Sequence, residues 1–223
     1  MSKQKIGWWL TAVCCTILFL VLTVSLLLVD VQSAGAQTVG WASLNFWWHD
    51  LISVQHGWHI VSNIVATVTL LALCAMVVWQ FIMMLRGKSF RAFLKQWLAF
   101  DITVILLVLC YVLFQIVVVN YRPILIDGMA EVSYPSSHIL LVATLLPLIV
   151  CTCWHNVPSK VWRRVIAVSA LVLMVVGIVA RTLCGYHWLT DSVGALLLSA
   201  ALVAWYKVMT QYKLPARREP SKL

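Results

Sequence analysis

The sequence predicts an all-α integral membrane protein, a bundle of six membrane-spanning helices in one domain covering residues 1–223. Hydrophobic residues make up 63% of the chain and charged residues 10%, whereas soluble domains average about 45–50% and about 25%. Six apolar stretches have the length of about 17–25 residues that crosses a bilayer as a helix. Basic residues gather in alternate segments between these stretches. Composition, segment length and charge distribution therefore favour the same fold class.

Each expected helix has a recognisable start or end. The first follows Lys3 and Lys5. Although residues 34–36 resemble a signal-peptidase site, this apolar run is longer than the roughly 7–15 residues of a signal peptide, so we expect it to be retained. The second and third helices flank a basic segment, the fourth follows Pro135, the fifth begins near Arg163, and the sixth leads into a basic tail. The expected helices are residues 8–29, 58–85, 98–119, 138–154, 162–180 and 188–206, and the tail is 207–223.

The positions of the charges predict the topology. If the N-terminus is cytoplasmic, segments 1–7, 86–97 and 155–161 and the tail are cytoplasmic, and fourteen of the sixteen basic residues lie in or beside them. Arg122 and Arg181 remain on the outer side. We therefore expect both termini in the cytoplasm, and a location in the cytoplasmic membrane of a bacterium with the active site facing outside. The net charge of +9 is spread over short loops without a reading module, which argues against a nucleic-acid partner.

The outer segment 30–57 is rich in tryptophan and histidine, which is typical of the headgroup layer. His56 and His59 are three residues apart, but no third ligand is evident, so we expect no metal site and no cofactor. All cysteines except Cys184 lie in apolar runs, where they serve as small hydrophobic residues. We therefore expect no disulfide framework.

Ionisable residues collect where the predicted helices meet the outer face. His187 and Asp191 are four residues apart, so on a helix they share a face and the carboxylate can fix the imidazole tautomer. This is the base-and-orienter part of a catalytic triad, with histidine itself as nucleophile. Arg122 and Arg181 suit a phosphate, because the planar guanidinium binds oxygens in pairs. Placing an aspartate and two arginines at the ends of membrane helices costs free energy, so their presence there indicates a function.

The segment Pro135-Ser136-Ser137-His138 reads as a helix start, where unpaired backbone N–H groups favour an anion. Ser136 and Ser137 are thus candidate phosphate ligands. His138 falls in the first turn, where it could protonate a leaving oxygen.

Together these residues resemble the phosphatidic acid phosphatase type 2 superfamily, whose motifs run K-x6-R-P, P-S-G-H and S-R-x5-H-x3-D. Arg122-Pro123 matches the end of the first motif. Pro135, Ser136 and His138 match the second, and Arg181, His187 and Asp191 match the third with both spacings intact. The resemblance implies a six-helix membrane phosphatase with a phosphohistidine at His187, oriented by Asp191. It also implies that His138 is the acid and that the arginines hold the phosphate.

Three positions depart from the family pattern. Gln115 stands where the first motif has lysine, Ser137 replaces the glycine of the second motif, and Ala180 replaces the serine of the third. Gln115 and Arg122 are seven residues apart, so we expect them to lie on one helix face about two turns apart. Losing a charged hydrogen bond there would weaken phosphate binding by about ten- to a hundredfold.

The function expected from the sequence is hydrolysis of a lipid phosphomonoester or diphosphate at the outer leaflet. Undecaprenyl diphosphate, phosphatidylglycerol phosphate and phosphatidic acid are the candidate classes, and membrane lipids are the expected partners. Two alternatives stay open. A phosphohistidine could be passed to an alcohol, which would make a lipid phosphotransferase, and the missing lysine would suit a catalytically weak lipid-phosphate binder or transporter.

Overall fold

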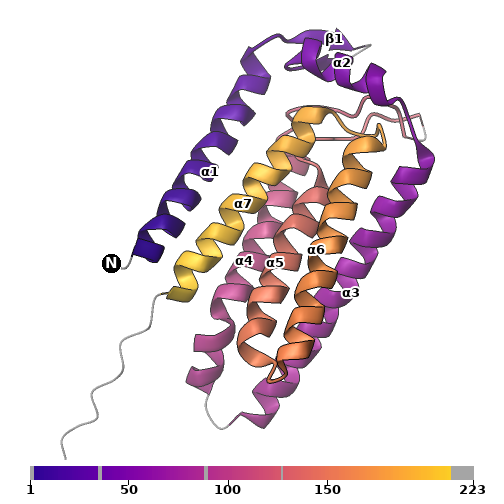
Figure 1. Cartoon of the computed structure of the whole chain (residues 1–223). Coiled ribbons are helices and arrows are strands. Elements are labelled where there is room, and N and C mark those ends of the chain that lie inside the picture. Colours follow the sequence, from indigo (N-terminus) through magenta and orange to yellow (C-terminus); the bar gives the residue numbers. More distant parts are fainter. Residues whose placement is uncertain (1–2, 35–36, 88–89, 127, 212–223) are drawn as a thin grey trace, which may run out of the picture.

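A computed structural model of the chain describes residues 3–34, 37–87, 90–126 and 128–211, with the backbone alone for 90–96 and 155. In this part the chain forms seven helices and one short antiparallel hairpin (Figure 1). The elements are α1 (Lys3–Leu28), β1 (Gln32–Ala34), β2 (Gln37–Val39), α2 (Ala42–Ile52), α3 (His56–Arg86), α4 (Phe90–Ile116), α5 (Ser137–Asn156), α6 (Lys160–Leu183) and α7 (Leu189–Gln211).

Six of these helices, all except α2, are long and apolar enough to cross a membrane. The prediction of an all-α fold with six candidate spans is therefore confirmed, and the chain is a multi-pass membrane protein. The helices extend beyond the apolar runs, because polar residues continue a turn or two past the hydrocarbon layer. Helix α7 reaches Gln211, so the predicted tail begins as helix, and residues 212–223 lie outside the described part, as does Lys88.

The third span differs from its prediction in a way that matters for function. Helix α4 ends at Ile116, three residues before the expected end, and the chain then runs as an irregular segment to Ser136. Because Arg122 lies in this segment, the expectation that Gln115 and Arg122 share a helix face is wrong. Three successive β-branched residues, Val117 to Val119, follow the helix and favour extended backbone.

Segment 30–57 forms a cap at one end of the bundle, with the β1–β2 hairpin followed by α2 (Figure 1). With 11 residues, α2 is too short to span a bilayer. Asn45 is fully buried on it and anchors the cap to α7: its Nδ2 donates to Oγ1 of Thr190 at 2.9 Å, and its Oδ1 accepts from the Thr190 backbone N–H at 3.2 Å. The segment that the sequence predicts to be interfacial thus folds as a cap that is joined to the bundle.

Helix α5 is the centre of the bundle and packs against α3, α4, α6 and α7. Its Ile139, Leu145 and Leu148 are fully buried, whereas α1, α3, α4 and α6 expose rows of valine and leucine side chains as a lipid-facing surface requires. Helix α1 packs along α7. The central position of α5 holds its first turn, with Ser137 and His138, against the ends of its neighbours.

Candidate active site

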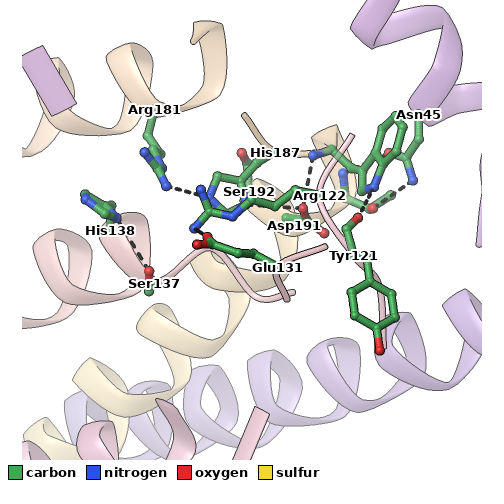
Figure 2. Close-up of polar contacts among 12 residues, drawn as sticks. Asn45, Tyr121, Arg122, Glu131, Ser137, His138, Arg181, His187, Asp191 and Ser192 are labelled. Atoms are coloured by element: carbon green, nitrogen blue, oxygen red, sulfur yellow. Dashed lines mark hydrogen bonds and ion pairs between the residues drawn. The ribbon is translucent and has the colours of Figure 1, made fainter. Parts of the chain in front are cut away.

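The residues singled out in the sequence meet at the end of the bundle that carries α2. They come from the start of α5, the end of α6, the α6–α7 connection with the start of α7, and the irregular segment after α4 (Figure 2). The backbone N–H of Ser136 donates to the carbonyl of Asp191 at 3.2 Å, which ties the start of α5 to α7. Topology and local contacts therefore bring four separate pieces of chain to one place.

His187 and Asp191 make the contact that their spacing predicts. Nδ1 of His187 lies 3.3 Å from Oδ2 of Asp191, and the same oxygen accepts the backbone N–H of Trp188 at 3.0 Å. Both side chains are buried, Asp191 completely and His187 to 3% exposure. The helix, however, begins at Leu189, so His187 precedes it and reaches Asp191 from the connection. A carboxylate accepts, so Nδ1 carries the proton and Nε2 is left with its lone pair.

The α6–α7 connection holds His187 because it is pinned on both sides. Gly185 has φ of 75°, and a Cβ there would lie 2.2 Å from the carbonyl oxygen of Ser53, so only glycine fits. The N–H of Gln55 donates to the carbonyl of Cys184 at 2.9 Å. On the other side, Nε1 of Trp188 donates to the carbonyl of Tyr121 at 2.7 Å.

Arg181 is the residue in contact with the free nitrogen of His187. Its Nη2 lies 2.7 Å from Nε2 of His187, and its Nη1 lies 3.0 Å from Nδ1 of His59. Its Nε is buried without a hydrogen-bond partner, and the whole side chain is only 1% exposed. A buried, unpaired guanidinium N–H costs free energy unless a ligand satisfies it.

The ordinary charge state of His187 follows from these surroundings. Burial, and then the positive charge of Arg181, hold the pKa of His187 well below its usual value of 6.5. At neutral pH the imidazole is therefore neutral. A neutral ring with Nδ1–H directed at Asp191 has the protonation state that a nucleophilic Nε2 needs.

Arg122 lies across the site from Arg181. Its Nη2 makes an ion pair with Oε2 of Glu131 at 3.1 Å, and its backbone N–H donates to the carbonyl of Glu131 at 2.9 Å. Its Nε is also buried without a partner. Figure 2 shows the guanidinium between Glu131 and the His187–Asp191 pair. Glu131 could not be predicted as the partner of Arg122, because this pairing depends on how the segment after α4 folds back on itself.

The start of α5 carries Ser136, Ser137 and His138. In Figure 2 the side chains of His138, Arg181 and His187 point toward one space. Nδ1 of His138 lies 3.5 Å from Oγ of Ser137, and the fully buried Oγ of Ser136 has no hydrogen-bond partner. The expected helix start is confirmed, since α5 begins at Ser137 with Ser136 as its N-cap. Free backbone N–H groups at this end are suited to a phosphate.

Two polar residues near Asp191 escaped the sequence analysis. Asn120 and Ser133 are buried and joined by a backbone hydrogen bond, with the Ser133 N–H donating to the Asn120 carbonyl at 3.0 Å. Nδ2 of Asn120, Oγ of Ser133 and Oδ1 of Asp191 are all buried without a hydrogen-bond partner. Asn120 precedes Arg122 by two residues, but no spacing rule links an asparagine in an irregular segment to a carboxylate on a later helix.

Gln115, the departure from the first motif, is exposed near the end of α4, and the helix ends between it and Arg122. Ala180, the other departure from the third motif, is fully buried on α6 and adds no polar group.

An apolar cavity of about 300 Å³ opens next to His138 between α3, α4 and α5. Its size is at the lower end of ligand pockets, about 300–1,000 Å³. Leucine, valine and alanine side chains form most of its wall, and its polar end is Ser137 and His138. The lining residues are Ala66, Leu70, Leu73, Val104, Leu107, Val108, Tyr111, Ser137, His138, Leu140, Leu141 and Leu145.

Among the described residues no group of three or more histidine, cysteine, aspartate or glutamate side chains could hold a metal ion. His56 contacts the hydroxyl of Tyr186, and His59 contacts Arg181. The positive charge of the site comes from its two arginines.

Comparison with known proteins gives two findings. The sequence profile of the PAP2 superfamily matches residues 81–215. The fold is similar to the crystal structure of a transmembrane PAP2 type phosphatidylglycerolphosphate phosphatase from Bacillus subtilis, with a TM-score of 0.59 over 88% of this chain and 94% of that chain, at 19% sequence identity. At this identity the likeness concerns the fold. No curated protein matches the sequence.

Proposed function

Since this chain belongs to the PAP2 superfamily and is a transmembrane lipid phosphate phosphatase, we propose that it hydrolyses lipid phosphomonoesters at the outer leaflet through a phosphohistidine on His187. The observation that carries the mechanism is the buried chain of contacts from Asp191 through His187 to Arg181, with separations of 3.3 and 2.7 Å. It leaves Nε2 of His187 neutral, oriented and adjacent to a phosphate-binding cation.

In the first step, Nε2 of His187 attacks phosphorus and the bond from phosphorus to the lipid oxygen breaks. His138, which takes up a proton when the phosphate anion is bound beside it, transfers this proton to that oxygen, so the lipid leaves as an alcohol. The imidazole becomes positively charged as the N–P bond forms, and Asp191 stabilises this charge through Nδ1–H. Before the attack, the N–H of Arg181 that points at Nε2 must turn to a phosphate oxygen.

In the second step, water attacks phosphorus and the N–P bond breaks. His138, now neutral, accepts the proton of the water, and His187 recovers its lone pair. Phosphate leaves, and both histidines return to their starting states. Arg122, Arg181 and the N–H groups at the start of α5 stabilise the charge on the phosphoryl oxygens during both steps.

The charges around His187 favour a monoester over a diphosphate. Two arginines face the site in the described residues, and one of them is already paired with Glu131. Gln115, which stands where the first motif has lysine, adds no charge. A diphosphate has more negative charge than a monoester, so it would leave more of its charge unmatched in this buried place.

The cavity beside His138 supports a lipid as the alcohol part of the substrate. An apolar wall of α3, α4 and α5 side chains can cover the first part of a hydrocarbon chain while the phosphate lies at the α5 start. Phosphatidic acid and phosphatidylglycerol phosphate are the classes we propose first, and the latter is the substrate after which the B. subtilis phosphatase is named.

The orientation of the site rests on charge. The ends of the bundle near residues 3, 86, 160 and 207 lie opposite the site (Figure 1) and bear Lys3, Lys5, Arg86, Lys160, Arg163, Arg164 and Lys207. By the positive-inside rule this end is cytoplasmic, which puts His187 at the outer face.

Purified protein in lipid vesicles tests the proposal. We would measure phosphate release from phosphatidic acid, phosphatidylglycerol phosphate and undecaprenyl diphosphate, and trap phosphoenzyme by rapid quenching with labelled substrate. The expected result is faster release from the monoesters and acid-labile, base-stable phosphate on His187. Turnover with no trapped phosphate under single-turnover conditions would contradict the covalent mechanism, and a preference for the diphosphate would contradict the substrate class.

A further inference from the structure

We propose that His59 on α3 is a positioning residue, which holds the guanidinium of Arg181 so that its Nε–Nη2 edge faces the phosphate and His187. This inference rests on the proposed function, because it concerns how the phosphate-binding arginine is oriented. The carrying contact is the 3.0 Å separation between Nη1 of Arg181 and Nδ1 of His59. No motif of the sequence includes His59, which is 122 residues from Arg181 in the chain.

The protonation state of His59 follows from its partners. An arginine can only donate, so Nδ1 of His59 accepts and has no proton. The neutral ring then carries its proton on Nε2, which lies 3.1 Å from Nδ2 of Asn63. An amide nitrogen cannot accept that proton, so this tautomer requires the carboxamide to be turned by half a rotation, with its oxygen toward the ring. Asn63, one turn along α3, in this way fixes the tautomer that Arg181 requires.

The ring of His59 is also held from the side. It stacks on the ring of Tyr186 with a centroid separation of 4.0 Å and an interplanar angle of 8°. The hydroxyl of Tyr186 lies 2.9 Å from Nδ1 of His56. Tyr186 directly precedes His187. The stack therefore links α3 to the short segment that carries the nucleophile, and it leaves His59 little freedom to turn away from Arg181.

The consequence for Arg181 comes from the shape of a guanidinium. The Nε and Nη2 hydrogens point from one edge, and Nη1 lies on the far side of that edge. With Nη1 bound to His59, Nη2 contacts Nε2 of His187 and Nε is buried without a partner. This edge is the one that binds two phosphate oxygens together. Without an acceptor at position 59, the buried Nη1 would have to find another partner, and the edge would turn from the phosphate.

Three variants separate positioning from packing. His59→Phe keeps the aromatic stack on Tyr186 but removes the acceptor. His59→Asn loses the ring but places an oxygen where Nδ1 was, because Oδ1 of asparagine and Nδ1 of histidine occupy equivalent positions on the side chain. His56→Ala is the matched control: it removes a histidine from the same turn of α3 that contacts Tyr186 and, by the contacts of the described residues, not Arg181.

The experiment measures kcat and KM for phosphatidic acid and the stabilisation of each variant by orthovanadate, which mimics the phosphoryl group. A ligand that binds the native state raises its unfolding temperature according to its affinity. We expect His59→Phe to lower kcat/KM by about ten- to a hundredfold, the worth of a charge-assisted hydrogen bond, and to lose most of the vanadate stabilisation. His59→Asn should recover most of both, and His56→Ala should match wild type.

Equal losses for His59→Phe and His59→Asn, or wild-type behaviour of His59→Phe, would overturn the inference. If His59→Phe does not fold, Asn63→Leu replaces it, since this change leaves the ring but frees its tautomer, and it should weaken vanadate binding relative to His59→Asn. The proposed function fails separately. In that case wild-type protein releases no phosphate and traps none, while the vanadate comparison among the variants still tests the orientation of Arg181.

Discussion

Nη2 of Arg181 lies 2.7 Å from Nε2 of His187, so in the absence of a phosphate the arginine occupies the lone pair of the histidine that we propose as nucleophile. The arginine and the nucleophile are thus held within bonding distance before substrate arrives, and the arriving phosphate needs only to replace one hydrogen bond. Such preorganisation avoids much of the cost of assembling charges during the reaction.

Removing the nucleophile or its orienting carboxylate should have different results. His187→Ala should abolish turnover and phosphoenzyme, since Nε2 is the attacking atom. Asp191→Asn should lower kcat by several powers of ten, by analogy with the roughly 10⁴-fold loss in the serine-protease triad. Oδ2 both accepts the Trp188 N–H and faces Nδ1, so an asparagine oxygen at this place can keep both contacts, but the negative charge that stabilises the imidazolium is lost.

The readouts for this pair are rapid-quench trapping and steady-state kinetics on protein whose thermal unfolding matches wild type. Ser192→Ala, on the next residue of α7, is a control in which the carboxylate is intact. Labelled phosphate on His187→Ala protein, or normal kcat for Asp191→Asn, would contradict the assignment.

Neutralising Glu131 should strengthen phosphate binding. In Glu131→Gln the ion pair with Nη2 of Arg122 is lost, and the guanidinium becomes free for the substrate. We expect a lower KM for phosphatidic acid and a larger gain for a diphosphate, because the extra negative charge is then better matched. The ion pair is partly exposed, so the gain should be small, within about tenfold.

Asp50→Asn supplies the control for this experiment. Asp50 is an exposed residue of α2, so this change removes a negative charge at the same end of the protein. A general effect of net charge would appear in both variants and would fade equally with salt. An unchanged KM in Glu131→Gln would mean that Arg122 binds phosphate without giving up its carboxylate.

The pH dependence of phosphoenzyme formation should report the low pKa of His187. Burial, and secondly Arg181, lower this pKa below 6.5, so the neutral nucleophile persists as pH falls through 6.5. The acid limb of the single-turnover rate should therefore lie below that pH. In Arg181→Gln a positive charge is removed, the pKa of His187 rises, and the acid limb should move to higher pH. A wild-type limb at or above pH 6.5 that does not move in Arg181→Gln would assign it to another group.

Much of the site could be predicted because several of its contacts join residues that are close together in the sequence. His187 and Asp191 are four residues apart, and His138 follows a proline-serine helix start, so their contacts arise within a turn or two of chain. The six spans could be predicted because hydrocarbon imposes length and apolarity on every crossing helix. The expectation that His187 and Asp191 share a helix face was nevertheless wrong, because His187 lies before α7 and not on it.

The remainder depends on contacts between distant parts of the chain. The pairing of Arg181 with His59, of Asn45 with Thr190, and of Arg122 with Glu131 follows from how helices and loops pack, which no periodicity encodes. The wrong expectation that Gln115 and Arg122 share a helix face has a related origin. A spacing of seven indicates one face only where the helix continues, and α4 ends at Ile116.

The proposed topology predicts which loops an impermeant thiol reagent reaches in intact cells. Met129, in the segment after α4, is exposed and lies at the same end as the site, and Gly87 follows α3 at the opposite end. With the exposed native cysteines replaced, Met129→Cys should be labelled and Gly87→Cys should be labelled only after lysis. The reverse pattern would put the site in the cytoplasm.

His138 should matter in proportion to how poor the leaving group is. A lipid alkoxide needs a proton as the bond to phosphorus breaks, whereas nitrophenolate leaves without one, so His138→Ala should lose far more activity on phosphatidic acid than on nitrophenyl phosphate. With nitrophenyl phosphate, the loss should be confined to the second step, in which His138 deprotonates water. Phosphoenzyme should then accumulate. Ser137→Ala is the matched control: its hydroxyl lies 3.5 Å from the His138 ring, and its removal should leave the ratio of the two activities unchanged. Equal losses of His138→Ala on both substrates without accumulated phosphoenzyme would mean that His138 supports the fold of the site and transfers no proton.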